Sequence, residues 1–176
     1  MASFLFLRGA NVGGHRTFRP AELAAALSDL RVESIGAAGT FIVRARITAS
    51  RLRTTVRSHL PFSAEIMICS DRALLAFADG HLFPRVIPSG ARRFVSILGK
   101  RPRSVPHLPF DYPAGAQWQV RVVGIEGQFV ASLWRRIGTR MIYPNEAVEK
   151  RFGVPATTRN WETMMRIADR LRSPHG

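Results

Sequence analysis

The sequence predicts an α+β fold whose sheets are mostly antiparallel, and two observations support this expectation. Short apolar runs that suit strands are interspersed with segments whose apolar residues recur at helical spacing. In the first half these segments follow the order strand, helix, strand, strand, helix, strand, and part of this order returns in the second half. The chain of 176 residues is long enough for one ordinary domain or for two small subdomains.

The first half, residues 1–80, contains four expected strands, over residues 4–8, 32–37, 40–45 and 65–69. Between them, Pro20 begins one helix, because a proline at the first helical position loses no hydrogen bond. Ser50 is expected to cap a second helix, in which Leu52 and Val56 lie on one face. This βαββαβ order is typical of the ferredoxin-like arrangement, an antiparallel sheet with two helices on one face.

The second half, residues 81–176, is expected to form a partial second copy of this arrangement. Strands are predicted over residues 94–98, 118–123 and 128–133, and the last two form a hairpin. Residues 99–116 are rich in proline, so we expect a long loop or an extended connection there in place of a helix. Asn145 is expected to cap a short helix, and Thr157 or Thr158 to cap the C-terminal helix.

The charge of the chain is strongly positive. It carries 26 Lys and Arg against 12 Asp and Glu, which gives a formal net charge of +14, and Lys100 and Lys150 are its only lysines. An excess this large favours polyanionic partners such as nucleic acids, because cationic side chains release counterions from phosphates. The alternative is a solvated arginine surface without a polyanionic partner.

Other bulk properties argue against several classes of protein. No apolar run approaches the roughly 18 residues that a membrane span needs, so no membrane partner is expected. The N-terminus lacks the basic start of a signal peptide, so none is expected. The single cysteine, Cys69, excludes an internal disulfide and is interpreted as a buried, inert thiol. These features indicate a cytoplasmic protein.

Three groups of basic residues are candidates for contacts with nucleic acid. They are Arg44, Arg46, Arg51, Arg53 and Arg57 around the second helix, Arg92, Arg93, Lys100, Arg101 and Arg103 around the fifth strand and the Pro-rich loop, and Arg135, Arg136 and Arg140 after the hairpin. No strand carries the aromatic pattern with which RNA-recognition sheets stack bases. The expected contacts are therefore with the phosphate backbone, with no choice between DNA and RNA.

A Gly-rich turn, Arg8-Gly9-Ala10-Asn11-Val12-Gly13-Gly14, follows the first expected strand. Such a turn can present backbone N–H groups to an anion, and the candidate binding residues are Arg8, Asn11, Gly13 and Gly14. The spacing of the glycines matches neither a P-loop nor a dinucleotide fingerprint. The alternative is that the glycines only supply the positive φ angles of a turn.

A second polar motif, Thr157-Thr158-Arg159-Asn160-Trp161-Glu162-Thr163, precedes the last expected helix. Arg159 and Asn160 would lie in its first turn, where the helix dipole favours anions. We hypothesise that they meet Arg8 and Asn11 in one pocket for a small anionic or nucleotide-like ligand. The alternative is that both side chains only bond neighbouring loops.

These two motifs resemble those of a bacterial family known as domain of unknown function 1697. The Gly-rich turn is similar to the family's RGxNVGG loop, and the C-terminal motif is similar to its TTRNWxT sequence. The spacing between the motifs also fits, so the resemblance covers nearly the whole chain. It implies an α+β fold with two ferredoxin-like halves and no settled activity.

The chain departs from the pattern of that family in three places. Ala38-Gly39-Thr40 stands where the family usually has Ser-Gly-Asn, and the Pro-rich segment replaces the family's middle helix in the second half. A Ser-Lys-Leu-like stretch is not evident over residues 132–143. If these parts form a shared active site, the resemblance implies an altered or lost activity for this chain.

Three interpretations of function follow from the sequence. The first is binding of nucleic acid or another polyanion through the arginine groups, and the second is an enzyme acting on a small anionic or nucleotide-like substrate in the hypothesised pocket. The third is an interaction protein that dimerises through sheet edges. The five histidines have no metal-ligand spacing and no carboxylate pair stands out, so we assign no catalytic residue, metal or cofactor.

Overall fold

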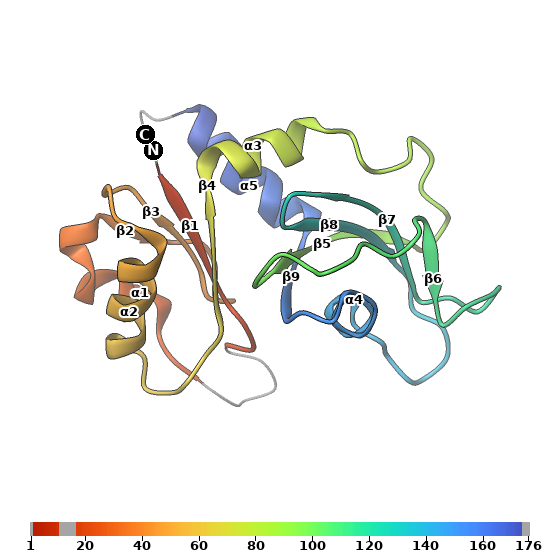
Figure 1. Ribbon diagram of the computed structural model, residues 1–176, viewed down its shortest axis with the longest axis horizontal. Coiled ribbons are helices and arrows are strands. Elements are labelled where there is room, and N and C mark those ends of the chain that lie inside the picture. Colours follow the sequence, from red (N-terminus) through yellow and green to blue (C-terminus); the bar gives the residue numbers. More distant parts are fainter. Residues whose placement is uncertain (1, 11–16, 174–176) are drawn as a thin grey trace. The chain divides into compact units, whose positions relative to one another are not determined.

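A computed structural model describes residues 2–10 and 17–173 of the chain (Figure 1). The chain divides into two compact units, Met1–Ala73 and Leu74–Gly176. The division lies within helix α3 (Asp71–Asp79), whereas the boundary expected from the sequence follows that helix. Each unit contains its own antiparallel sheet, which confirms the predicted α+β class.

The first unit has the ferredoxin-like order. Its elements are β1 (Ser3–Leu7), α1 (Pro20–Ala26), a 3₁₀ turn (Ser28–Leu30), β2 (Val32–Ser34), β3 (Thr40–Val43), α2 (Ala49–His59) and β4 (Ile66–Ser70). The strands lie in the order β2-β3-β1-β4, and every neighbouring pair is antiparallel. Because β3 lies between β1 and β2, the first βαβ unit is split, as the predicted pattern requires.

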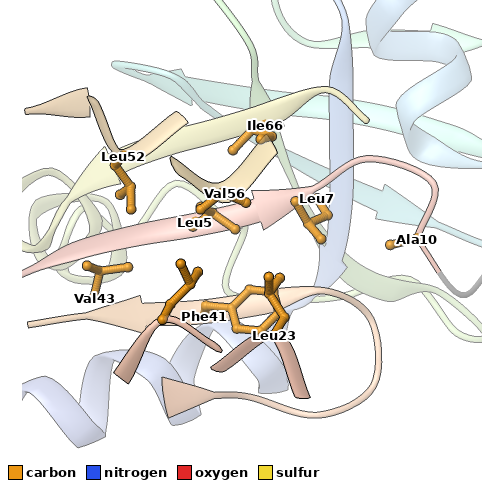
Figure 2. Packing of buried hydrophobic residues seen from close by; sticks show 10 residues of the cluster. Leu5, Leu7, Ala10, Leu23, Phe41, Val43, Leu52, Val56 and Ile66 are labelled. Atoms are coloured by element: carbon orange, nitrogen blue, oxygen red, sulfur yellow. The ribbon is translucent and has the colours of Figure 1, made fainter. Parts of the chain in front are cut away.

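The core of the first unit forms where α1 and α2 cover one face of this sheet. Leu5 and Leu7 are two residues apart on β1, so they point to the same face. They pack in one cluster with Leu23 of α1 and with Leu52 and Val56 of α2 (Figure 2). Full burial of a leucine or valine side chain contributes about 1.5–3 kcal/mol. The two helices are therefore held by their apolar faces, as the sequence predicted.

The start of α2 differs from the expectation by two residues. Thr48, not Ser50, is the N-cap, and its hydroxyl accepts a hydrogen bond from the N–H of Arg51 at 3.3 Å. Ile47 packs against the core cluster just before the cap. This apolar anchor fixes where the chain enters the helix, so Ser50 falls inside the first turn.

The second unit repeats the strand order of the first. Its elements after α3 are β5 (Arg92–Leu98), β6 (Phe110–Tyr112), β7 (Val120–Glu126), β8 (Phe129–Trp134), α4 (Pro144–Phe152), β9 (Ala156–Asn160) and α5 (Trp161–Arg172). The sheet has the order β6-β7-β8-β5-β9 with antiparallel neighbours. Apart from the edge strand β6, this order matches β2-β3-β1-β4, and no helix forms between β5 and β7 in that fully described stretch. The predicted partial second copy is confirmed.

Helices cover both faces of the second sheet. Val148 and Phe152 of α4 pack with Val130 of β8 on one face. Phe129, the preceding residue, points to the other face, where its ring lies 5.1 Å from that of Phe77 on α3. On this second face α3 and α5 lie side by side (Figure 1), and Asp79 of α3 forms an ion pair with Arg172 of α5 at an N–O distance of 2.6 Å.

Two helix starts in the second unit also differ from the sequence predictions. Tyr143 is the N-cap of α4 and Pro144 occupies its first position, which suits a residue without an N–H, so Asn145 is not the cap. Thr157 and Thr158 belong to strand β9, where β-branched side chains are favoured, and Asn160 caps α5 instead.

Candidate functional site

Arg159 is a buried cation on a strand rather than an exposed one on a helix. It lies on β9 opposite Val95 of β5, and 8% of its surface is exposed. Its guanidinium donates hydrogen bonds to the hydroxyl of Thr157 and to the carbonyl of Thr158, both at 2.9 Å. Burial lowers the pKa of Arg159 to about 10, so the side chain is still protonated at neutral pH. The expectation that Arg159 lies in the first turn of the last helix is wrong.

Asn160 is exposed and its side chain has a structural partner. Its Oδ1 accepts a hydrogen bond from the N–H of Thr163 at 2.8 Å, and its extended backbone leads directly into α5. The side chain therefore satisfies one of the free N–H groups at the start of the helix. The expected threonine cap is replaced by this asparagine, which lies before the helix rather than in its first turn.

The other half of the hypothesised pocket comes from the Gly-rich turn. Three of its candidate residues, Asn11, Gly13 and Gly14, lie outside the residues that the structure describes. Arg8 is described: it is half-buried, and its N–H donates to the carbonyl of Glu65 at 3.0 Å. Arg8 belongs to the first unit, whereas Arg159 and Asn160 belong to the second. A shared pocket for these side chains therefore stays a prediction.

The first group of basic residues divides into side chains with different surroundings. Arg44 forms an ion pair with Glu33 at 3.6 Å, and the Nε of Arg53 donates to the carbonyl of Ile66 at 3.4 Å. Arg57 is exposed on α2. The remaining two members, Arg46 and Arg51, line one groove.

This groove, called the α2 groove below, follows α2 from its N-cap Thr48 past Thr55 to its last residue, His59, and has a volume of about 630 Å³. Arg46 and Arg51 contribute two guanidinium groups, and the residues between them include the N-cap Thr48. Apolar side chains from Leu27, Leu30 and Ile47 also line it, and so does Asp29. The first turn of α2 contains no acidic residue, so the positive end of this 11-residue helix adds to the two cations.

The second group of basic residues also contains side chains with different surroundings. Arg92 is exposed, whereas the guanidinium carbon of Arg93 lies 5.8 Å from the centre of the Phe83 ring. Arg101 and Arg103 are exposed on the Pro-rich segment between β5 and β6. Lys100 is exposed on the same segment.

In the third group, Arg135 has a structural role that the sequence did not indicate. Its guanidinium carbon lies 4.0 Å from the centre of the Trp118 ring, and its nitrogens donate to the carbonyls of Trp118 and Ala116 at 2.9 and 2.6 Å. Arg121 also lies over the Trp118 ring, at 4.5 Å. Two cations thus stack on one buried indole, an arrangement that stabilises the hairpin. Arg136 and Arg140, the other members of the group, are exposed.

Arg121 is held in this stack by a carboxylate on the edge strand. It forms two hydrogen bonds with Asp111, at 2.6 and 2.8 Å, in the fork geometry that suits a guanidinium. The hydrogen bond to Asp111 raises the pKa of Arg121. Residues 111, 118, 121 and 135 meet only after the strands pair, so no local sequence signal could have revealed the stack.

The described residues contain no group of three His, Cys, Asp or Glu side chains that could hold a metal ion. Cys69 is buried on β4, and burial, with a smaller effect of Asp71, raises the pKa of its thiol far above the usual value. Among the helices of the described part of the chain, none has the length and apolar character needed to cross a membrane.

Comparisons with known proteins inform the fold and leave the function open. No protein-family model matches the chain, and no curated protein matches it. A solved structure, that of the conserved bacterial protein SP0830 from Streptococcus pneumoniae, is similar over 97% of this chain and 98% of that chain, with a TM-score of 0.60 and 19% sequence identity. At this identity the likeness concerns the fold alone, and it agrees with the α+β architecture described above.

Proposed function

We propose that this protein binds the phosphate backbone of nucleic acid, with the α2 groove as its principal contact. The observation that carries the proposal is that Arg46 and Arg51 line one groove along α2, near the N-terminal, positive end of that helix. A helix N-terminus carries about half a positive charge, and two guanidinium groups beside it suit a phosphate oxygen. The net charge of +14 would attract a polyanion to this surface.

The composition of the α2 groove fits a phosphate with a sugar or base attached. Its apolar lining, which includes Leu27 and Ile47, offers contact surface beside the cations. Asp29 is its only carboxylate among the described lining residues, so Arg46 and Arg51 outnumber it. A free phosphate needs only the cations, whereas a nucleotide unit would use both kinds of surface.

Arg101, Arg103 and Arg136 support the same proposal as additional contacts. All three are exposed, and none forms an ion pair with a carboxylate among the described residues. Such side chains can contact phosphates without displacing an existing partner. They would contribute to affinity and to its salt dependence, but they carry no information about base sequence.

The test is a fluorescence-anisotropy titration of nuclease-treated protein with labelled single- and double-stranded DNA and RNA at several salt concentrations. Log affinity falls as log salt concentration rises, and each lost phosphate contact makes this dependence less steep by about 1. We therefore expect the double variant Arg46→Gln, Arg51→Gln to make it less steep by about 2.

The matched control is the double variant Arg57→Gln, Arg92→Gln, which removes the same charge from exposed positions that lie outside the groove and are not among the proposed contacts. A smaller loss of affinity and of salt dependence in this control than in the groove variant supports the α2 groove. Equal losses in the two double variants would exclude the groove as the principal contact. Absence of binding by the unmodified protein at physiological salt would reject nucleic-acid binding altogether.

The family and the location of the chain are further proposals. We infer membership of the family known as domain of unknown function 1697 from its two motifs, the Gly-rich turn and residues 157–163. We infer a cytoplasmic location from the single cysteine, Cys69. Neither inference carries an activity to this chain.

A further inference from the structure

A pocket lined by aromatic side chains lies on the second unit, and of the three basic groups only Arg93 contributes to it. Its volume is about 400 Å³. Phe77 of α3, Phe83 of the following loop and Trp161 at the start of α5 form its aromatic lining. The ring of Trp161 lies 5.1 Å from that of Phe83 and 6.2 Å from that of Phe77, and both contacts are edge-to-face.

The cations of this pocket are not neutralised by its own lining. Arg93 and Arg85 line it together with His81, and no Asp or Glu does so among the described residues. The Nε of Arg93 is buried and has no hydrogen-bond partner within the described part of the chain. Because Arg85 and Arg93 meet no carboxylate in this lining, the pocket carries a positive charge that favours an anionic ligand.

The backbone that carries this lining is held against the sheet by close packing. Leu82 lies over Gly124 of β7, where a side-chain carbon would come within 3.1 Å of the leucine. His81 has a φ angle of 49°, in the left-handed region that non-glycine residues seldom adopt. Together these features turn the chain after α3 so that residues 81–85 lie beside Trp161.

We propose that this pocket binds a small molecule that has a planar aromatic ring and an anionic group. Pockets of about 300–1,000 Å³ with an aromatic lining and a few polar groups are typical of small-ligand sites. The aromatic side chains favour a flat ring by stacking or edge contacts, and the guanidinium of Arg93 favours a carboxylate or phosphate. Aromatic carboxylates and nucleotides share this chemistry. The inference does not depend on the α2 groove, because it concerns different residues in the other unit.

The test follows the three tryptophan indole N–H signals of ¹⁵N-labelled protein during titration with 2-naphthoate. A dissociation constant of about 1 mM or tighter is expected, the value that ordinary ligand efficiency gives a probe of this size. The signal of Trp161, assigned with Trp161→Phe, should shift, whereas those of Trp118 and Trp134 should stay. Parallel titrations use neutral 2-naphthamide, saturated cyclohexanecarboxylate and adenosine monophosphate.

The decisive variant is Arg93→Gln, with Arg92→Gln as its control. Arg92 is the exposed neighbour on β5, and its side chain points to the opposite face of the sheet. Loss of one charge-assisted hydrogen bond predicts that Arg93→Gln weakens 2-naphthoate binding about tenfold, while Arg92→Gln leaves it within about twofold. Thermal melting of both variants checks that each is folded. If Arg93→Gln is unfolded, Arg93→Met, which also removes the charge but keeps a long apolar side chain, takes its place.

Each outcome bears on the proposal. Preference for 2-naphthoate over both the neutral and the saturated probe supports it, and adenosine monophosphate then shows whether nucleotides use the same site. Equal binding of 2-naphthamide would reject the anionic requirement. No shift of the Trp161 signal at 10 mM probe (about ten times the expected constant), or equal weakening by both arginine variants, would overturn the proposal.

Discussion

Replacement of Asn160 by alanine separates a structural role from a binding role at the C-terminal motif. The Oδ1 of Asn160 accepts the hydrogen bond from the N–H of Thr163 at 2.8 Å, and this is its described partner at the start of α5. Alanine cannot accept that bond, whereas aspartate and serine can. We therefore expect Asn160→Ala to destabilise the protein, and Asn160→Asp and Asn160→Ser to retain most of its stability.

The size of this effect follows from the position of the cap. Loss of an N-cap side chain costs about 0.5–2 kcal/mol, typically about 1 kcal/mol. The residue is exposed, so no cavity or repacking cost adds to this value. For a chain of 176 residues that unfolds cooperatively, about 1 kcal/mol lowers the melting temperature by about 2–4 °C.

The assay is calorimetry and urea unfolding of the three variants beside the unmodified protein. An unchanged melting temperature in Asn160→Ala would refute the capping argument. The aspartate variant also tests the hypothesised anion site, because it keeps the cap and adds a negative charge. If Asn160→Asp abolishes binding of an anionic ligand at unchanged stability, the residue has a binding role besides the cap.

Three other predictions concern buried side chains. Leu52→Ala should cost about 3–5 kcal/mol in urea unfolding, because Leu52 is fully buried in the core of the first unit, and a loss below about 1 kcal/mol would mean that the core is wrongly described. Cys69 should react with a thiol reagent such as 5,5′-dithiobis(2-nitrobenzoate) only at the rate of unfolding, because the thiol is buried and its pKa is raised; rapid labelling of native protein would contradict this. Burial lowers the pKa of Arg159 to about 10, so above that pH the unfolded state binds more protons than the folded state. The free energy of unfolding, measured in urea relative to that of Arg159→Met, should therefore rise between pH 10 and 12. A difference in free energy that stays constant over this range would refute the prediction.

The order of strands and helices was predictable because it depends on the spacing of apolar residues within each short segment. Leu5 and Leu7 alternate on a strand, and Leu52 and Val56 recur at helical spacing. Such periods reveal an element without knowledge of its neighbours. Residues 99–116 excluded a helix for the same local reason, the presence of proline.

The environment of the motif at residues 157–163 was not predictable in this way. Thr157 and Thr158 have the side chains of helix caps, and the sequence was interpreted accordingly. Their place on β9 depends on pairing with β5, where the hydroxyl groups of Ser96 and Thr158 lie 2.7 Å apart. That partner is 62 positions away in the sequence, so only the folded sheet reveals that Arg159 is buried.

The same limitation applies to the basic groups. Charge and sequence spacing identified Arg46, Arg53 and Arg135 as equivalent candidates. In the structure Arg46 lines the α2 groove, Arg53 donates to a backbone carbonyl and Arg135 stacks on Trp118. A guanidinium can serve as ligand, hydrogen-bond donor or packing surface, and only its neighbours determine which.

The edge strand β6 has a consequence for association between chains. An unpaired strand edge offers N–H and C=O groups with which a second chain can extend the sheet. Here β6 has three residues, is flanked by Pro109 and Pro113, and is tied to β7 by the Asp111–Arg121 pair. A proline has no N–H to donate, so the flanks of β6 cannot prolong a ladder. The second sheet therefore ends at β6, and pairing of this edge with a strand of another chain, in a dimer or a fibril, is disfavoured.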